Sequence, residues 1–279
     1  MNRAQMHAAK RDPLAVLEHP VRRERPILVA VLAVLAACQS APAITDPVDI
    51  ITQGLQATAD LKSFHVSLEL NGDVSIPDGG GTFNLDSTSL EADVDVPAKN
   101  LKASLAVPAF LGLTADVIVI GDDVWVRTSM GGTKWSHSTN DMMGSPLPIP
   151  TASAGVEEMI DKLKEALATE GVVTKKLADV ACGDRQCYQV SISVPSSLMD
   201  EAGAVASLDP ASIFGDAVEI NLLFDREKLW LTEVSSGVAS DEIGTISATL
   251  SFSSFDEAVE FSPPPSPDVT EGEFTIPGM

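Results

Sequence analysis

The sequence predicts an α+β protein built on a single strongly curved antiparallel sheet, with amphipathic helices on its concave face. Apolar and polar residues alternate in many short segments between residues 63 and 254, as in strands with one buried face. Tight turns separate neighbouring segments, which favours hairpins and hence antiparallel pairing. Other stretches carry apolar residues at helical spacing, and such helices need a sheet to lie on.

The first helix is expected at residues 47–60. Asp46 is a good N-cap, and Pro47 suits the first helical position because an N–H is not needed there. The apolar residues that follow recur at helical spacing: Val48, Ile51, Leu55 and Ala59. This pattern predicts one apolar side along the helix.

About eleven strands follow from the alternation and the turns. In the clearest of them, Phe64, Val66 and Leu68 alternate with polar residues. The expected strands are residues 63–71, 82–87, 89–96, 100–107, 115–120, 124–129, 172–180, 186–194, 217–225, 228–237 and 243–254. A single sheet of this size tends to curl, so we expect strong curvature.

Two further helices interrupt the strands. Ser153 can cap the first, whose apolar residues recur at helical spacing: Val156, Met159, Ile160, Leu163 and Leu167. The second is expected at residues 196–208, before Pro210. Because three helices can cover only one face of such a sheet, residues 47–262 are expected to form one domain. Residues 263–279 are Pro-rich and acidic and are expected to form a mobile tail.

The chain as a whole is strongly acidic. Its 279 residues include 18 Lys and Arg against 40 Asp and Glu, which gives a net charge of −22. Nucleic acid is therefore not an expected partner, since its phosphates are repelled by such a surface. Up to residue 37, however, basic groups outnumber acidic ones. A basic leader thus precedes an acidic body.

The leader has the pattern of an export signal. Basic residues at 22–25 precede an uncharged apolar run at 26–37, and Cys38 follows. The run is too short to cross a bilayer as a helix, which takes about 20 residues. Leu35-Ala36-Ala37-Cys38 resembles the bacterial lipobox, in which the cysteine thiol receives a diacylglycerol group. We therefore predict a signal peptide at residues 1–37 and lipidation of Cys38. Plain secretion with an incidental cysteine is the alternative.

Lipidation of Cys38 implies a membrane-anchored protein. The diacylglycerol group, with an N-acyl chain such as palmitate, supplies at least two hydrocarbon chains, which suffice for stable anchoring. Residues 38–46 then form a short tether that holds the body off the membrane. The expected location is extracytoplasmic, on the outer face of the plasma membrane. The sequence leaves protein partners and the oligomeric state open.

The other two cysteines are close together in the sequence. Cys182 and Cys187 enclose the turn residues 183–186, and apart from Cys38 the chain has no further cysteine. In an extracytoplasmic protein such a pair predicts a disulfide, with the two residues opposite one another at the base of a hairpin. A metal site is the weaker interpretation, because two thiolates without a nearby histidine supply half of a tetrahedral shell.

No catalytic motif stands out. His65 lies on the polar side of a predicted strand and His137 in a Ser-rich loop, so solvated histidines are expected rather than catalytic ones. Gly79-Gly80-Gly81 has no helix after it, which argues against a phosphate-binding loop. Calcium ligation is the alternative to solvated carboxylates for two aspartate pairs, Asp93 with Asp95 and Asp122 with Asp123. We predict no enzyme activity, no metal and no cofactor.

Several segments resemble the LppX/LprAFG family of bacterial envelope lipoproteins. Besides the lipobox, they are the end of the first helix with the next strand, a strand pair followed by a tryptophan, and an aromatic, acidic and Pro-rich ending. These are residues 59–66, 115–126 with Trp135, and 252–264. The resemblance extends over nearly the whole chain after Cys38.

The resemblance implies an incomplete barrel whose concave side, roofed by helices, encloses an apolar cavity for acyl chains, similar to carriers that move lipoproteins across a periplasm. It further implies a protein that binds a lipid or glycolipid and carries it from the plasma membrane into the cell envelope. The candidate cavity residues lie on the helices and in one apolar loop: Val48, Ile51, Leu55, Phe110, Leu111, Val156, Met159, Ile160, Leu163 and Leu167.

The same helical faces are also compatible with a solid core and no cavity. In that case the protein is an envelope structural or interaction module that docks a polymer or a partner protein on the outer face of its sheet. An enzyme is the most distant hypothesis, because no nucleophile and base can be paired by spacing.

Overall fold

The computed structural model describes residues 43–76, 81–139, 156–198, 215–240 and 244–271. Residues 44–279 form one compact unit, in which all the described helices and strands lie. No helix among these described residues is both long and apolar enough to cross a membrane.

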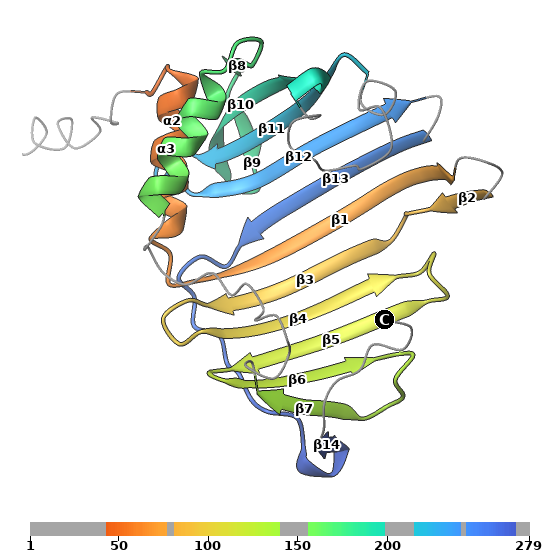
Figure 1. The fold of residues 1–279 in the computed structure, drawn as a ribbon. Helices are drawn as coiled ribbons and strands as arrows, with labels where there is room; N and C mark the ends of the chain where they lie inside the picture. The colour runs from red at the N-terminus through yellow and green to blue at the C-terminus, as the bar shows by residue number, and fades with distance from the viewer. Residues whose placement is uncertain (1–42, 77–80, 140–155, 199–214, 241–243, 272–279) are drawn as a thin grey trace, which may run out of the picture. The chain divides into compact units, whose positions relative to one another are not determined.

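One large open sheet organises this unit (Figure 1). The strand order is β14-β7-β6-β5-β4-β3-β1-β13-β12-β11-β10-β8, with β2 on β1 and β9 on β10. Every pairing is antiparallel except that of β14 with β7. The strands are β1 (Ser63–Ile76), β2 (Gly81–Asn84), β3 (Thr88–Asp95), β4 (Asn100–Val107), β5 (Leu113–Ile120), β6 (Asp123–Thr128), β7 (Trp135–Thr139), β8 (Val173–Lys176), β9 (Val180–Cys182), β10 (Arg185–Pro195), β11 (Ala217–Asp225), β12 (Leu231–Ser240), β13 (Gly244–Ser253) and β14 (Val269–Glu271).

The predicted fold class, α+β with one curved and mostly antiparallel sheet, is confirmed. Two strands were not expected from the sequence, β7 and β14. The segment at 172–180, expected as a single strand, is divided between the short strands β8 and β9.

In the part of the chain that the structure describes, two α-helices accompany the sheet, α2 (Pro47–Ala59) and α3 (Val156–Leu167). The Asp46 side chain accepts hydrogen bonds from the N–H groups of Val48 and Asp49 at 2.8 and 3.2 Å, so the predicted N-cap is confirmed. A single 3₁₀ turn, η4 (Ser196–Leu198), begins where a further helix was expected. The rest of that predicted helix and Ser153 lie outside the described residues.

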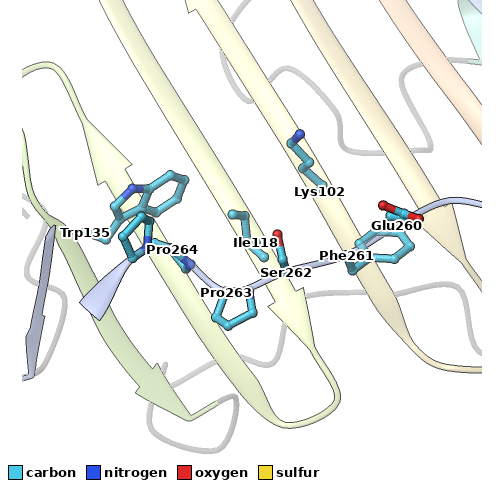
Figure 2. Close-up of a pocket in the computed structure, with 9 residues that line it drawn as sticks. Lys102, Ile118, Trp135, Glu260, Phe261, Ser262, Pro263 and Pro264 are labelled. Carbon is cyan, nitrogen blue, oxygen red and sulfur yellow. The ribbon is translucent and has the colours of Figure 1, made fainter. Parts of the chain in front are cut away.

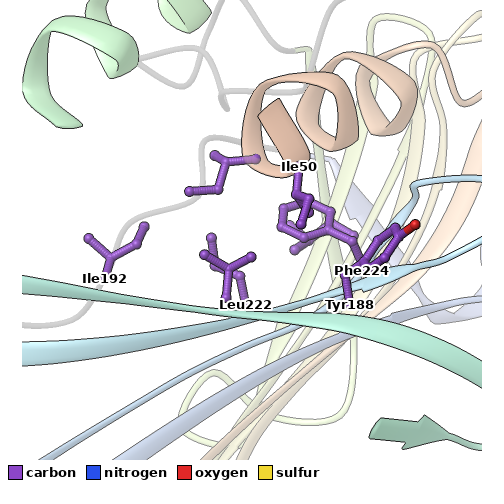
Figure 3. Packing of buried hydrophobic residues seen from close by; sticks show 8 residues of the cluster. Ile50, Tyr188, Ile192, Leu222 and Phe224 are labelled. Carbon is purple, nitrogen blue, oxygen red and sulfur yellow. The ribbon is translucent and has the colours of Figure 1, made fainter. Parts of the chain in front are cut away.

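The main hydrophobic core lies between α2 and one end of the sheet (Figure 3). Ile50 and Ile51 of α2 are fully buried against Phe224 of β11 and its neighbours on β10. Gly54, one turn further along, lies so close to the Phe224 ring that there is no room for a β-carbon. Leu163 and Leu167 of α3 pack against the same cluster. The two helices therefore cover the end of the sheet formed by β8 and β10–β12.

The C-terminal segment packs on the sheet over its described residues, which end at Glu271. Asp256 accepts a hydrogen bond from the backbone N–H of Lys62 at 2.8 Å, and the Phe255 ring packs on Trp230 with centroids 4.9 Å apart. Further along, Pro264 is buried, and after the 3₁₀ turn η5 (Ser266–Asp268) strand β14 pairs with β7. Residues 263–271, which were expected to belong to a mobile tail, thus include a 3₁₀ turn and a strand that pairs with the sheet.

Candidate functional site

One face of the sheet is apolar across most of its width. Directly opposed residues in neighbouring antiparallel strands project from the same face, so the register defines a row of side chains. From β10 to β5 one such row is aliphatic throughout: Val190, Leu222, Val234, Leu250, Leu68, Leu90, Leu105 and Ala115. We call this side, on which α2 packs, the apolar face.

Charge is absent from this face across six central strands. Within the paired segments of β13, β1, β3, β4, β5 and β6, only two residues on the apolar face are polar. They are Thr88 and Thr128. The others are Gly244, Ile246, Ala248, Leu250, Phe252, Phe64, Val66, Leu68, Leu70, Gly72, Val74, Leu90, Ala92, Val94, Leu101, Ala103, Leu105, Val107, Leu113, Ala115, Val117, Val119, Val124 and Val126.

Burial varies along the apolar face. Val190 and Leu222, beneath the helices, are 0% and 8% exposed. In the middle of the same row, Leu68, Leu90 and Leu105 are only half-buried. The described helices therefore leave the central strands partly open, and a broad strip of aliphatic surface extends from β13 to β5.

One polar group on the apolar face has no partner among the described residues. The Thr88 hydroxyl is buried, and none of these residues offers a hydrogen-bond partner to its Oγ1 atom. Thr88 lies directly opposite Leu70, next to the half-buried strip. A buried hydroxyl without a partner costs free energy, of the order of 1–3 kcal/mol, that an acceptor atom placed beside it would recover.

The opposite side of the sheet, the polar face, carries a hydrogen-bonded network. The His65 ring lies between two carboxylates of β3, with Nδ1 2.7 Å from Asp93 and Nε2 2.7 Å from Glu91. The hydrogen bond with Asp93 raises the pKa of His65; burial opposes it, and Glu91 adds to it. On the next strands, Arg127 pairs with Asp116 at 2.7 Å and lies over the Trp135 ring.

The C-terminal segment crosses this polar face. Ile118, Trp125 and Trp135 form an apolar cluster there, against which Val269 of β14 packs. Figure 2 shows residues 260–264 running past Ile118 and Trp135. They enclose an open pocket of about 270 Å³, lined by Lys102, Ile118, Trp135 and residues 260–265. We call residues 255–271 the strap.

The predicted cavity residues fall into separate regions. Ile51 is fully buried in the main core, Ile160 is 7% exposed, and Leu55, Leu163 and Leu167 pack around that core. Val48 is half-buried near the start of α2. Phe110 and Leu111 lie in the β4–β5 turn, far from the helices along the sheet, and are 53% and 94% exposed. The side chains of Val156 and Met159, and the whole of Cys38, lie outside the described residues.

The residues of the central strip were not among the candidates. Their signal was present in the sequence, since the alternation in segments such as 63–71 and 100–107 identified the strands. From the sequence, this alternation predicted only which face of each strand is buried. The extent to which helices cover that face depends on tertiary structure, which the alternation does not report.

Cys182 and Cys187 form a disulfide with their Cα atoms 5.9 Å apart. They are not directly opposite one another, as the spacing suggested: Cys182 faces Arg185 and Cys187 faces Val180. The bridge therefore runs diagonally across the β9–β10 hairpin. Within the described ranges, no group of three or more His, Cys, Asp or Glu side chains is arranged to hold a metal ion.

Comparisons with known proteins find similarity of structure alone. No protein-family model and no curated protein sequence matches the chain. Lipoprotein LppX of Mycobacterium tuberculosis is similar with a TM-score of 0.45 and 18% identity, over 77% of this chain and 97% of LppX. LprF of Mycobacterium bovis gives 0.45 and 16%, over 79% and 98%. The MucA/MucB complex of Pseudomonas aeruginosa gives 0.35 and 10%, over 76% and 56%.

Proposed function

We propose that this protein is a membrane-anchored lipoprotein that binds an acylated lipid or glycolipid on the apolar face of its sheet and carries it from the plasma membrane into the cell envelope. The observation that carries this proposal is the half-buried aliphatic strip on β13, β1, β3, β4 and β5. It is continuous, uncharged and only partly covered by the described helices.

The chemistry of the strip suits an acyl chain. Each methylene removed from water contributes about 0.8 kcal/mol, and a hydrocarbon tail needs no polar partner along its length. Aliphatic side chains such as Leu68, Leu90 and Leu105 provide a lining that can adapt to chains of different shape. Transfer of the lipid from the bilayer to the protein is favourable only if its contacts with the strip match in free energy the contacts that it loses in the bilayer.

The distribution of charge supports a carrier that faces water on its other side. The ionisable residues of the central strands lie on the polar face, where His65 binds Glu91 and Asp116 binds Arg127. The acidic body is thus the solvated exterior of the protein. In this proposal the acyl groups on Cys38, and not surface charge, hold it at the membrane.

Native mass spectrometry tests the proposal. The chain beginning at residue 39, exported without the anchor and purified without detergent, should retain lipid, and the mass difference gives the ligand's identity. It should also take up a pyrene-labelled fatty acid. Recovery of protein that is empty in repeated preparations and fails to bind the labelled fatty acid would contradict the proposal.

The alternative is an interaction module with a solid core. It is favoured by one observation: beneath the helices the apolar face is fully packed, with Ile50, Ile51 and Phe224 all 0% exposed. This alternative predicts that no lipid co-purifies and that a partner binds the polar face. The same mass measurement therefore separates the two functions.

The anchor is tested separately. Replacing Cys38 by alanine should release the protein into the medium or leave it unprocessed, because no thiol remains to receive the diacylglycerol. A cleaved Cys38→Ala protein that is still retained on the membrane would rule out lipidation of this residue.

A further inference from the structure

Two turns at one end of the sheet expose large apolar side chains. In the β4–β5 turn, Phe110 is 53% and Leu111 94% exposed, and in the β6–β7 turn Met130 is 50% exposed. Figure 1 shows both turns at the end of the sheet away from α2 and α3. We call residues 108–112 and 129–134 together the tip.

The tip is held together by hydrogen bonds. Ser129 joins the two turns: its N–H donates to the Thr114 carbonyl at 2.9 Å, and its Oγ accepts from the Thr114 N–H at 3.0 Å. Within the first turn, the Gly112 N–H donates to the Pro108 carbonyl at 3.0 Å, and Leu113 donates to Phe110 at 3.0 Å. The exposed side chains are thus presented by an ordered backbone.

The position of Leu111 is not explained by the fold. Its φ of +54° is in the left-handed region, which favours glycine, and Gly112 beside it has a φ of +69°. At 94% exposure, the Leu111 side chain packs against almost nothing. A leucine here contributes neither to the core nor to the turn, so its apolar surface points to a contact outside the chain.

The charge of the tip distinguishes it from the rest of the protein. The chain carries a net charge of −22, yet residues 101–114 and 124–135 contain no Asp or Glu. Lys134, which is exposed, is the one ionisable residue of the tip itself. The nearest acidic side chain along β5, Asp116, is paired with Arg127. Apolar side chains beside a cation match a bilayer surface with anionic headgroups.

The tip is also continuous with the apolar face. Val107 and Leu113 face one another on that side at the ends of β4 and β5, directly next to the turn that holds Phe110 and Leu111. An acyl chain that leaves a bilayer at the tip therefore reaches the aliphatic strip without crossing the polar face.

We propose that the tip inserts Phe110, Leu111 and Met130 into the anionic outer surface of the membrane, so that the apolar face opens toward the bilayer. This proposal adds a membrane-binding site to the proposed function, and its account of how a lipid leaves the bilayer rests on that function. Membrane binding by the tip does not itself require a lipid on the strip. The two can therefore be tested independently.

The test is flotation of the chain beginning at residue 39 with vesicles of phosphatidylglycerol and phosphatidylcholine. Replacing Phe110 and Leu111 together by serine should lower the vesicle partition coefficient at least about tenfold. The matched control replaces Val173 and Leu177 by serine; these are exposed apolar residues at the other end of the sheet and should leave binding unchanged. Leu111→Gly, which suits the backbone at this position, should weaken binding without loss of stability.

Three outcomes would overturn the proposal: no binding of the wild-type chain to these vesicles, equal binding by the tip variant, or an equal loss in the control. Pyrene-labelled fatty acid uptake, measured without vesicles, separates this result from the proposed function. A protein that binds vesicles through the tip but takes up no fatty acid would support membrane binding by the tip and contradict the proposed carrier function.

Discussion

The Nδ1 atom of His65 on β1 lies 2.7 Å from a carboxylate oxygen of Asp93, directly opposite it on β3. Glu91 approaches the other ring nitrogen at the same distance. A neutral imidazole can donate through only one of its nitrogens, whereas the imidazolium donates through both. The geometry therefore favours the charged ring, consistent with the raised pKa of His65.

This arrangement predicts a stability that falls as pH rises above the ordinary histidine pKa of 6.5. Because the pKa of His65 is higher in the folded than in the unfolded chain, its contribution is fully present below the ordinary value of 6.5 and is lost as pH rises through the folded pKa. Urea unfolding of the wild type and of His65→Gln should differ most near pH 6. The difference should shrink as pH rises, and one that is constant with pH would contradict the prediction.

Gly54 lets α2 approach the sheet. A β-carbon there would overlap the Phe224 ring and lie 3.0 Å from the Leu229 carbonyl. Gly54→Ala should therefore lower the free energy of unfolding by about 1–3 kcal/mol through overpacking. It should do so even though alanine is the better helix former by up to about 1 kcal/mol. Gln53→Ala, at the exposed neighbouring position, should stay within about 0.5 kcal/mol of the wild type.

The strap protects both a tryptophan and a sheet edge. Ending the chain after Glu260 removes the residues that cover Ile118 and Trp135, together with the strand that pairs with β7. The free energy of unfolding should fall by about 3 kcal/mol, and acrylamide should quench the fluorescence of Trp135 more strongly. The bare β7 edge should promote association at high concentration, measurable by sedimentation. Ending the chain after Glu271 keeps the strap and should change none of these quantities.

Segments with one clearly apolar face were predictable from the sequence. In β1 and β4 the alternation of Leu, Val and Phe with polar residues is regular, so strand and face follow directly. The Asp46-Pro47 start of α2 was predictable for the same kind of local reason, since cap and first turn depend on adjacent residues.

The elements that the sequence did not reveal depend on distant contacts. In β7, Ser136 and Ser138 stand where an apolar face would be, and the strand is held by Trp135 and by pairing with β6. A Pro-rich strap is typical of a mobile tail when considered alone. The signal that this segment packs on the sheet lies elsewhere in the sequence, in Ile118 and the two tryptophans, Trp125 and Trp135, on an otherwise polar face. Sequence periodicity does not connect these distant segments.

The central strip itself is tested by two neighbouring residues on opposite faces. Leu105 is half-buried on the apolar face between Leu90 and Ala115, whereas Ser104 is exposed on the polar face and donates a hydrogen bond to Asp116. Leu105→Asn places an amide against the proposed acyl chain, where an unpaired polar group costs about 1–3 kcal/mol. Affinity for the pyrene-labelled fatty acid should therefore fall about tenfold or more.

Ser104→Asn introduces the same amide one residue away, where water solvates it and Asp116 can still accept its hydrogen bond. This variant should bind the fatty acid as the wild type does. Circular dichroism and urea unfolding of both proteins establish that they are folded at the temperature of the binding measurement. Equal affinities for the two variants would show that the ligand does not lie on this strip, because of these two positions only 105 is on the apolar face.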